Sequence, residues 1–181
     1  MKTQIAMPFC LVLAISYSTE SFAGQAEITW SDPARYTDIW PSQQVTRATT
    51  LKNVKHAFTG AFSESAAALP DGYAFKAAIT DVDLAGQVSP PQLLMVDPKL
   101  VNRPQLLSTR ALTVNYFPAI RLDYTLTDPQ GNILLSQEGV LVNDPSYLTR
   151  VNAGSTSTPF FYETRMIRDW FGAAIVPAAV Q

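Results

Sequence analysis

Apolar and polar residues alternate in two early stretches of the chain, and a helical pattern separates them. The alternation predicts strands over residues 26–30 and 73–83. Between these strands, apolar residues recur mostly at steps of three and four, which is typical of an amphipathic helix. We expect this helix over about residues 43–68, with Ser42 as its N-cap and residues 70–72 (Pro-Asp-Gly) ending it.

The clearest alternation in the chain lies between residues 120 and 127, and it predicts one strand of a β-hairpin. Residues 128–132 have the composition of a turn, and residues 133–142 would return as the second strand. A further strand is expected over residues 110–115. Residues 87–108 contain four prolines and are expected to form an irregular connector.

The last predicted element is a helix. Thr158 is its expected N-cap, Pro159 would be its first helical residue, and Gly172 would end it. We expect one charged, solvated face on this helix, made by Glu163, Arg165, Arg168 and Asp169.

The resulting order is β-α-β-β-β-β-α, and it predicts an α+β fold. A single domain would contain an antiparallel or mixed sheet of about four or five strands, covered on one face by two helices. We expect this domain to occupy residues 24–181.

Residues 1–23 have the pattern of a secretory signal peptide: a basic start, an apolar run over residues 5–15, and a small-x-small site that ends at Ala23. The apolar run is shorter than the ~20 residues of a membrane span. We expect cleavage after Ala23 and a soluble periplasmic product. Cys10, the only cysteine, would leave with the peptide, so no disulfide is expected in the mature chain.

The formal charge of −2 argues against nucleic acid or an anionic membrane as the main partner. His56 is the only histidine and lies off the apolar stripe of the first helix, so we expect it at the surface rather than in a zinc site. The chain has no G-x-S-x-G, S-x-x-K or phosphate-binding glycine motif. We therefore expect no cofactor.

Asp81 and Asp83 end the second strand and are the strongest candidates for chemistry. Side chains two residues apart on a strand point the same way, about 7 Å apart. The apolar residues at 75, 77 and 79 would share this face, so the stripe that faces the core is expected to turn acidic at its end.

Two interpretations of this pair stay open. The carboxylates could begin a calcium or magnesium site, with further ligands brought in by the fold. Alternatively they accept backbone N–H groups and shape the turn into residues 84–86. The spacing D-x-D-x-D-G of a calcium loop is absent, which favours the structural role. The further ligands considered are Asp38, Asp71 and Asp144.

Short motifs spread through the chain resemble an uncharacterised family of exported bacterial proteins, domain of unknown function 3016. They are Trp30 with Asp32-Pro33, Tyr36-Thr37-Asp38-Ile39, Leu69-Pro70, Thr80-Asp81-Val82-Asp83-Leu84-Ala85-Gly86, Tyr116-Phe117-Pro118, Leu122-x-Tyr124-x-Leu126-x-Asp128-x-x-Gly131, Asp144 with Tyr147, Tyr162-Glu163 and Asp169-Trp170-Phe171. The resemblance implies an exported α+β domain and brings no known activity. Trp40, Ala119 and Thr164 stand where the family often has basic residues, which argues against an anion site at those positions.

We favour a non-catalytic module that binds or supports a protein partner of the cell envelope, through its sheet edge or the connector. The first alternative is a divalent-cation or small-ligand binding module centred on Asp81 and Asp83, with Asp38 and Glu163 as further candidates. The second is a carbohydrate hydrolase, which needs two carboxylates about 5–9 Å apart. Its candidate acids are Asp38, Asp81, Asp83, Glu138 and Glu163, and its candidate aromatic platforms are Trp30, Trp40 and Trp170. The oligomeric state stays open.

Overall fold

The computed structural model describes residues 24–40, 45–89, 92–94, 105–107, 109–149 and 158–180, and the structural statements below concern these residues. The predicted signal peptide, Ser42 and much of the predicted connector lie outside them.

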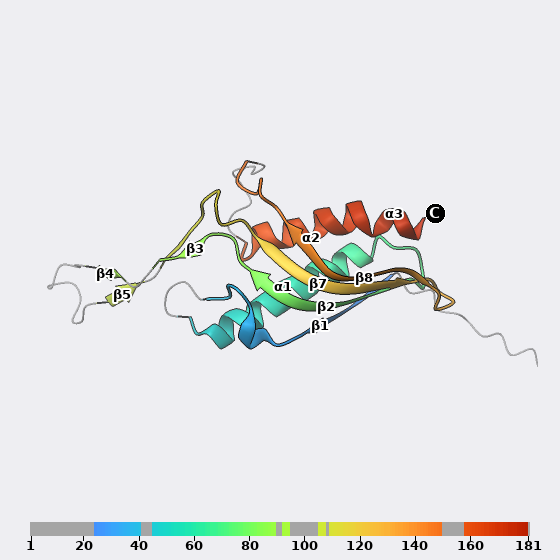
Figure 1. Cartoon of the computed structure of the whole chain (residues 1–181), viewed down its shortest axis with the longest axis horizontal. Helices are drawn as coiled ribbons and strands as arrows, with labels where there is room; N and C mark the ends of the chain where they lie inside the picture. The colour runs from blue at the N-terminus through green and yellow to red at the C-terminus, as the bar shows by residue number, and fades with distance from the viewer. Residues whose placement is uncertain are drawn as a thin grey trace, which may run out of the picture.

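A mixed sheet of four strands forms the body of the domain (Figure 1). In sheet order the strands are β1 (Gln25–Trp30), β2 (Ala74–Asp83), β7 (Ala119–Thr127) and β8 (Ile133–Asn143). β1 is parallel to β2, and the other two pairs are antiparallel. A parallel pair needs a long crossover, which helix α1 (Arg47–Ala66) provides between β1 and β2. The predicted α+β fold is confirmed.

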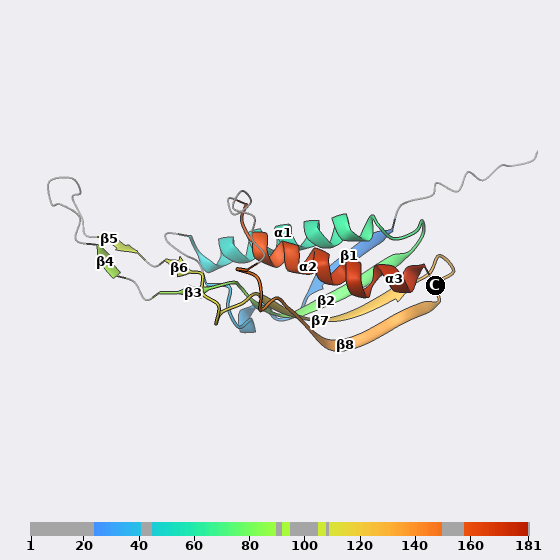
Figure 2. The same ribbon diagram turned by 90° about the horizontal axis from the view of Figure 1, so that it is seen from above.

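Two helices lie on one face of this sheet, as predicted (Figure 2). They are α1 and α2 (Phe161–Ala174), and the short α3 (Val176–Ala179) follows α2. Near the start of β2, Phe75 is fully buried, and the centre of the Phe171 ring in α2 lies 4.8 Å from the centre of the Phe75 ring. Removing such a ring costs about 3–5 kcal/mol, so this aromatic contact is a main link between the layers. None of the described helices is long and apolar enough to span a membrane.

Both helices start later than the sequence pattern predicts. α1 begins at Arg47, and its N-cap is Thr46, whose Oγ1 accepts the N–H of Thr49 at 3.2 Å. α2 begins at Phe161 after Phe160, which has a φ of 57° and no side-chain cap. The ring of Phe160 packs edge-on against Phe58 at 6.4 Å, so core packing overrides the capping preference of Thr158. Gly172 does not end α2, which continues to Ala174.

The β7–β8 hairpin agrees closely with its prediction. Asp128 organises the turn, because its Oδ1 accepts the N–H groups of Gln130 at 2.9 Å and Asn132 at 2.8 Å. Arg121 and Asp123 interact across the strands, as their place on the polar face suggested. Arg121 donates to the carbonyl of Gly139 at 3.0 Å, and Asp123 accepts the N–H of Gly139 at 2.6 Å.

The end of β2 contradicts the expected acidic stripe. The pairing of β2 with β7 shifts between Ile79 and Asp81, which is a β-bulge. A shift of one residue exchanges the two faces of a strand. Val82 is therefore fully buried, while Asp81 and Asp83 are only partly buried and leave the core face.

The segment after β2 was expected to be an irregular connector over residues 87–108 followed by a strand over residues 110–115, but its described residues form two short two-stranded ribbons. β3 (Gln87–Val88) pairs with β6 (Arg110–Ala111), and β4 (Gln92–Leu94) pairs with β5 (Gln105–Leu107). The strand expected over residues 110–115 is thus wrong beyond Ala111. Residues 112–115 are exposed and have no partner strand among the described residues, so their β propensity alone does not make them a strand.

Candidate functional site

The candidate site lies where β2 ends, and Asp81 holds the loop after β1 against this end of the strand. Oδ1 of Asp81 accepts the N–H groups of Thr37 at 2.7 Å and Val82 at 2.8 Å. Its Oδ2 accepts the Thr37 hydroxyl at 2.7 Å. Both oxygens are thus bound by donors of this chain, and Asp81 ties the loop after β1 to the end of β2.

Arg110 joins the same loop to the turn after β2. Its Nη1 and Nη2 bind the two carboxylate oxygens of Asp38 at 2.8 and 3.1 Å, with both side chains less than one-fifth exposed (16% and 18%). The guanidinium also donates to the carbonyls of Trp40 and Gly86, each at 2.9 Å. Such a two-pronged pair is strong and geometrically specific, so Arg110 acts as a clamp on this corner.

Asp83 lies beside Asp38, because residues 38 and 83 form a parallel β-bridge. Burial raises the pKa of the Asp83 carboxyl, and the neighbouring Asp38 and Asp81 raise it further. Arg110 acts in the opposite direction. Three of the predicted candidates, Asp38, Asp81 and Asp83, therefore do gather at one corner.

Glu163 reaches this corner from the first turn of α2. It is only 4% exposed, and its Oε1 accepts the N–H of Ala85 at 2.8 Å. Burial raises the pKa of its carboxyl, against the lowering effects of the Ala85 N–H, its own N–H and Arg110, while Asp38 raises it. The Ala85 amide lies just past the end of β2, and a buried N–H left without a partner costs about 1–3 kcal/mol.

The prediction of a solvated face on the last helix is therefore wrong for two of its four residues, Glu163 and Arg165. Glu163 points into the domain, and Arg165 donates to the buried Asp144 at 3.2 Å and to the carbonyl of Tyr147 at 3.0 Å. Arg168 and Asp169 are exposed as predicted. The spacing of charges along a helix does not reveal that its first turn meets the end of the sheet.

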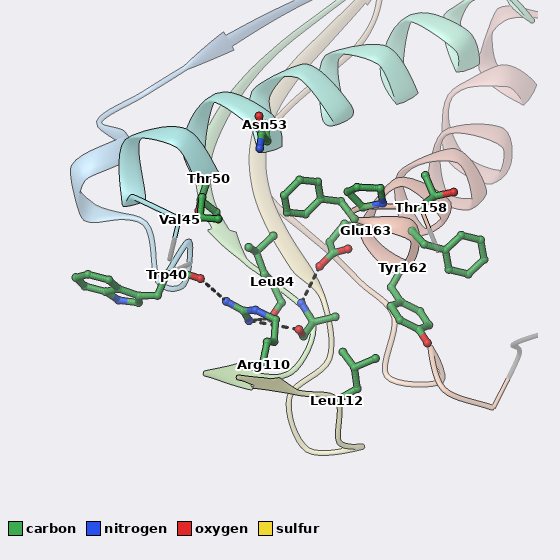
Figure 3. A pocket seen from close by; sticks show the side chains of 14 residues that line it. Trp40, Val45, Thr50, Asn53, Leu84, Arg110, Leu112, Thr158, Tyr162 and Glu163 are labelled. Atoms are coloured by element: carbon green, nitrogen blue, oxygen red, sulfur yellow. Dashed lines mark hydrogen bonds between the residues drawn. The ribbon is translucent and has the colours of Figure 1, made fainter. Parts of the chain in front are cut away.

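A pocket of about 370 Å³ opens between this corner and the N-terminal turns of α1 and α2 (Figure 3). Its lining comprises Trp40, Val45, Thr50, Asn53, Leu84, Ala85, Arg110, Leu112, Thr158, Pro159, Phe160, Phe161, Tyr162 and Glu163. Trp40, Val45 and Leu112 are among the exposed large apolar residues, at 58%, 43% and 44%. Apolar residues exposed in one place often mark a binding site.

Of the predicted acidic candidates, only Glu163 lines this pocket among the described residues; Asp38, Asp81 and Asp83 support its wall from behind. Glu138 lines a different, shallow groove on the opposite face of the sheet. The described lining thus contains one carboxylate and lacks the pair that glycoside hydrolysis uses. No group of three or more metal-binding side chains comes together among the described residues.

The aromatic candidates also separate. Trp40 stands at the pocket, whereas Trp30 packs against Phe58 at 6.2 Å and Trp170 against Tyr124 at 5.5 Å. His56 is exposed on α1, as predicted. Sequence reasoning missed the clamp made by Arg110, because 72 residues separate it from Asp38 and no local spacing links the two.

Comparison with known proteins gives one family match, which covers residues 24–173. The family is described as protein of unknown function (DUF3016). The chain matches none of the curated proteins and none of the solved structures.

Proposed function

Because the chain belongs to the DUF3016 family, which brings no activity with it, we propose a function from the site: an exported, non-catalytic binding module that holds a small organic ligand in the pocket described above. This proposal moves the small-ligand alternative from Asp81 and Asp83 to Glu163.

The observation that carries the proposal is the buried Glu163 carboxyl in the wall of an open pocket whose lining includes Trp40, Phe160, Phe161 and Tyr162. Ligand pockets are typically concave and apolar, with a few polar groups that orient the ligand, and their volumes begin at about 300 Å³. Burying an ionisable group is costly, and the N–H of Ala85 accounts for one oxygen of this carboxyl, so its remaining acceptor positions call for a further reason. Ligand recognition supplies one.

The surroundings support binding rather than turnover. The Arg110 clamp and the Asp81 contacts hold the corner in one geometry. The described lining offers one carboxylate and no histidine, so it does not supply the acid and base that a hydrolysis would use.

Three small aromatic probes test the proposal: benzylamine, benzyl alcohol and benzoate, added to the ¹⁵N-labelled protein at up to about 10 mM. We expect at least one probe to shift the amide signals of Thr50, Leu112 and Tyr162, while Ser136 on the opposite sheet face stays unchanged. The substitution Trp40→Ala should weaken binding, and because Trp40 is 58% exposed it should leave the fold intact. The proposal fails if no probe shifts these signals.

Export to the periplasm belongs to the same proposal. In support of it, the family match begins at Gly24, the residue after the predicted cleavage site. N-terminal sequencing of the protein from a periplasmic fraction should read Gly24 first. An intact Met1 chain in the cytoplasm would refute export.

A second candidate function is the binding of an envelope protein at the β8 edge. β8 is an edge strand of eleven residues with one charged residue, and Ile133, Leu134 and Leu141 on it are 65%, 40% and 51% exposed. An exposed edge with apolar residues can pair with a strand of another chain. A photoreactive residue at Leu141 should then cross-link a partner in exporting cells, whereas one at the exposed His56 should not. Equal labelling from both positions, or none, would exclude this candidate.

A further inference from the structure

We propose that the pocket selects an organic cation: a primary ammonium group that pairs with Glu163, carried on an aromatic or apolar body that lies against Trp40 and Leu112. This inference rests on the proposed function and specifies the class of ligand.

Two arginines near the pocket are each paired with a carboxylate. Arg110 is paired with Asp38 at 2.8 Å, and Arg165 is paired with Asp144 at 3.2 Å on the far side of the first turn of α2. Each pair is close to neutral. The two guanidinium groups therefore do not make the pocket attractive to an anion.

The remaining charges around the pocket are mostly negative. Among the described residues, Glu163 lines the pocket and Asp81 and Asp83 lie behind its wall, while the guanidinium of Arg47 lies 5.4 Å from the centre of the Trp40 ring. A cleft lined by an excess of one sign attracts ligands of the other. The local field thus favours a cation and opposes a carboxylate or phosphate.

The Glu163 carboxylate has acceptor capacity left for such a ligand. A carboxylate offers about four acceptor positions. The N–H of Ala85 donates to Oε1 at 2.8 Å, and the N–H of Glu163 itself also lies close. Burial raises the pKa of this carboxyl, against the lowering effects of the Ala85 N–H, its own N–H and Arg110, so burial disfavours its ionised form. An ammonium group would supply the missing stabilisation.

The aromatic rings of the lining already hold cations. Arg47 lies over Trp40, and Arg165 lies 5.5 Å from the ring centre of Phe161 and 6.0 Å from that of Tyr162. Aromatic faces attract ammonium and guanidinium groups through the ring quadrupole. The rings of Trp40, Phe161 and Tyr162 can therefore also attract a cationic ligand, at positions that the arginines leave open.

The test compares the affinities of benzylamine, benzyl alcohol and benzoate by calorimetry of the purified protein at neutral pH. A hydrogen bond to a charged group is worth about 1.5–3 kcal/mol, so benzylamine should bind roughly tenfold to a hundredfold more tightly than benzyl alcohol. Benzoate should be the weakest. The variant Glu163→Gln keeps an oxygen that accepts the Ala85 N–H, so it should fold, lose the preference for the amine and bind benzyl alcohol within ~2-fold of the parent.

Each outcome separates the two proposals. If benzyl alcohol binds as tightly as benzylamine, or if Glu163→Gln keeps the preference, the pocket is a binding site but the cationic selectivity is refuted. If benzoate binds best, the charge argument is wrong. If no probe binds, the proposed function fails together with this inference. The variant Trp40→Ala should weaken all three probes alike, and selective loss of the amine there would place its site at the Trp40 ring instead of Glu163.

Discussion

The variant Arg110→Ala removes the clamp that joins the loop after β1 to the turn after β2. Asp38 would then keep a largely buried carboxylate without its cation, and the carbonyls of Trp40 and Gly86 would each lose a donor at 2.9 Å. The alternating hydrophobic pattern of the sheet is untouched. We therefore expect a protein that still folds but is clearly less stable.

The magnitude follows from the exposure of the pair. Removing one partner of a buried ion pair costs about 3–5 kcal/mol. Arg110 and Asp38 are 16% and 18% exposed, so solvent reduces the effect and we expect a loss of about 3 kcal/mol. The pair of Arg168 and Glu64 provides a matched control at 2.8 Å, because its side chains are 47% and 65% exposed. Arg168→Ala should cost about 0–1 kcal/mol.

Urea unfolding of both variants, followed by circular dichroism, measures the difference. The midpoint of Arg110→Ala should fall well below that of Arg168→Ala at an unchanged slope. The double variant Asp38→Ala with Arg110→Ala should be more stable than the sum of its single variants, by about 1–3 kcal/mol of coupling. Equal losses in Arg110→Ala and Arg168→Ala, or additive losses in the double variant, would refute the clamp.

Three further predictions concern the same corner, with Gly131 in the β7–β8 turn as a control. The pKa of the Glu163 carboxyl is raised above its usual value of 4.5 in the folded protein, so the folded state binds more protons than the unfolded state, and the free energy of unfolding should fall as the pH rises from about 4.5. The urea midpoint should therefore fall less steeply with pH in Glu163→Gln than in the parent, and an equal dependence on pH would contradict the raised pKa. Gly86 and Gly131 both have positive φ, near +80° and +84°, but a Cβ at Gly86 would clash with the carbonyl of Ala111, whereas a Cβ at Gly131 would meet open space. In thermal unfolding, Gly86→Ala should cost about 3 kcal/mol of stability and Gly131→Ala about 1 kcal/mol, and equal losses would exclude the clash. The Thr80 hydroxyl is buried with no hydrogen-bond partner among the described residues, so Thr80→Val should be neutral or stabilising by about 1 kcal/mol, and a clear loss would show that the hydroxyl has a partner.

The sheet and its two helices could be predicted because their patterns are local. Residues 120–127 alternate without interruption, and β7 spans Ala119–Thr127. The predictions fail where tertiary contacts determine the local structure. Phe160 caps α2 with a positive φ because its ring packs against Phe58, and no rule for capping residues anticipates that contact.

The sequence pointed to the acidic part of the candidate site and offered Trp40 as one of three possible aromatic platforms. Asp38, Asp81, Asp83 and Glu163 do lie at one end of the sheet, but the pocket depends on residues with no sequence signal. Arg110 looks like an ordinary strand residue, and nothing in the sequence separates Trp40 from Trp30 and Trp170, which pack against the core. The roles of Arg110 and Trp40 come from contacts between segments that are far apart along the chain.

The bulge in β2 connects the fold to the site. Without the shift between Ile79 and Asp81, Asp81 would face the helices and Val82 would face solvent, which would bury a charge and expose an apolar side chain. With the shift, Val82 completes the core, and Asp81 turns to the Thr37 loop. β2 then ends, and the N–H of Ala85 just beyond it requires a partner inside the domain. Glu163 provides it, which brings the first turn of α2 to the end of the sheet and forms the pocket between the two helices. The buried carboxyl is thus required by the fold at one oxygen, and its remaining acceptor capacity faces the site where we propose that a cation binds.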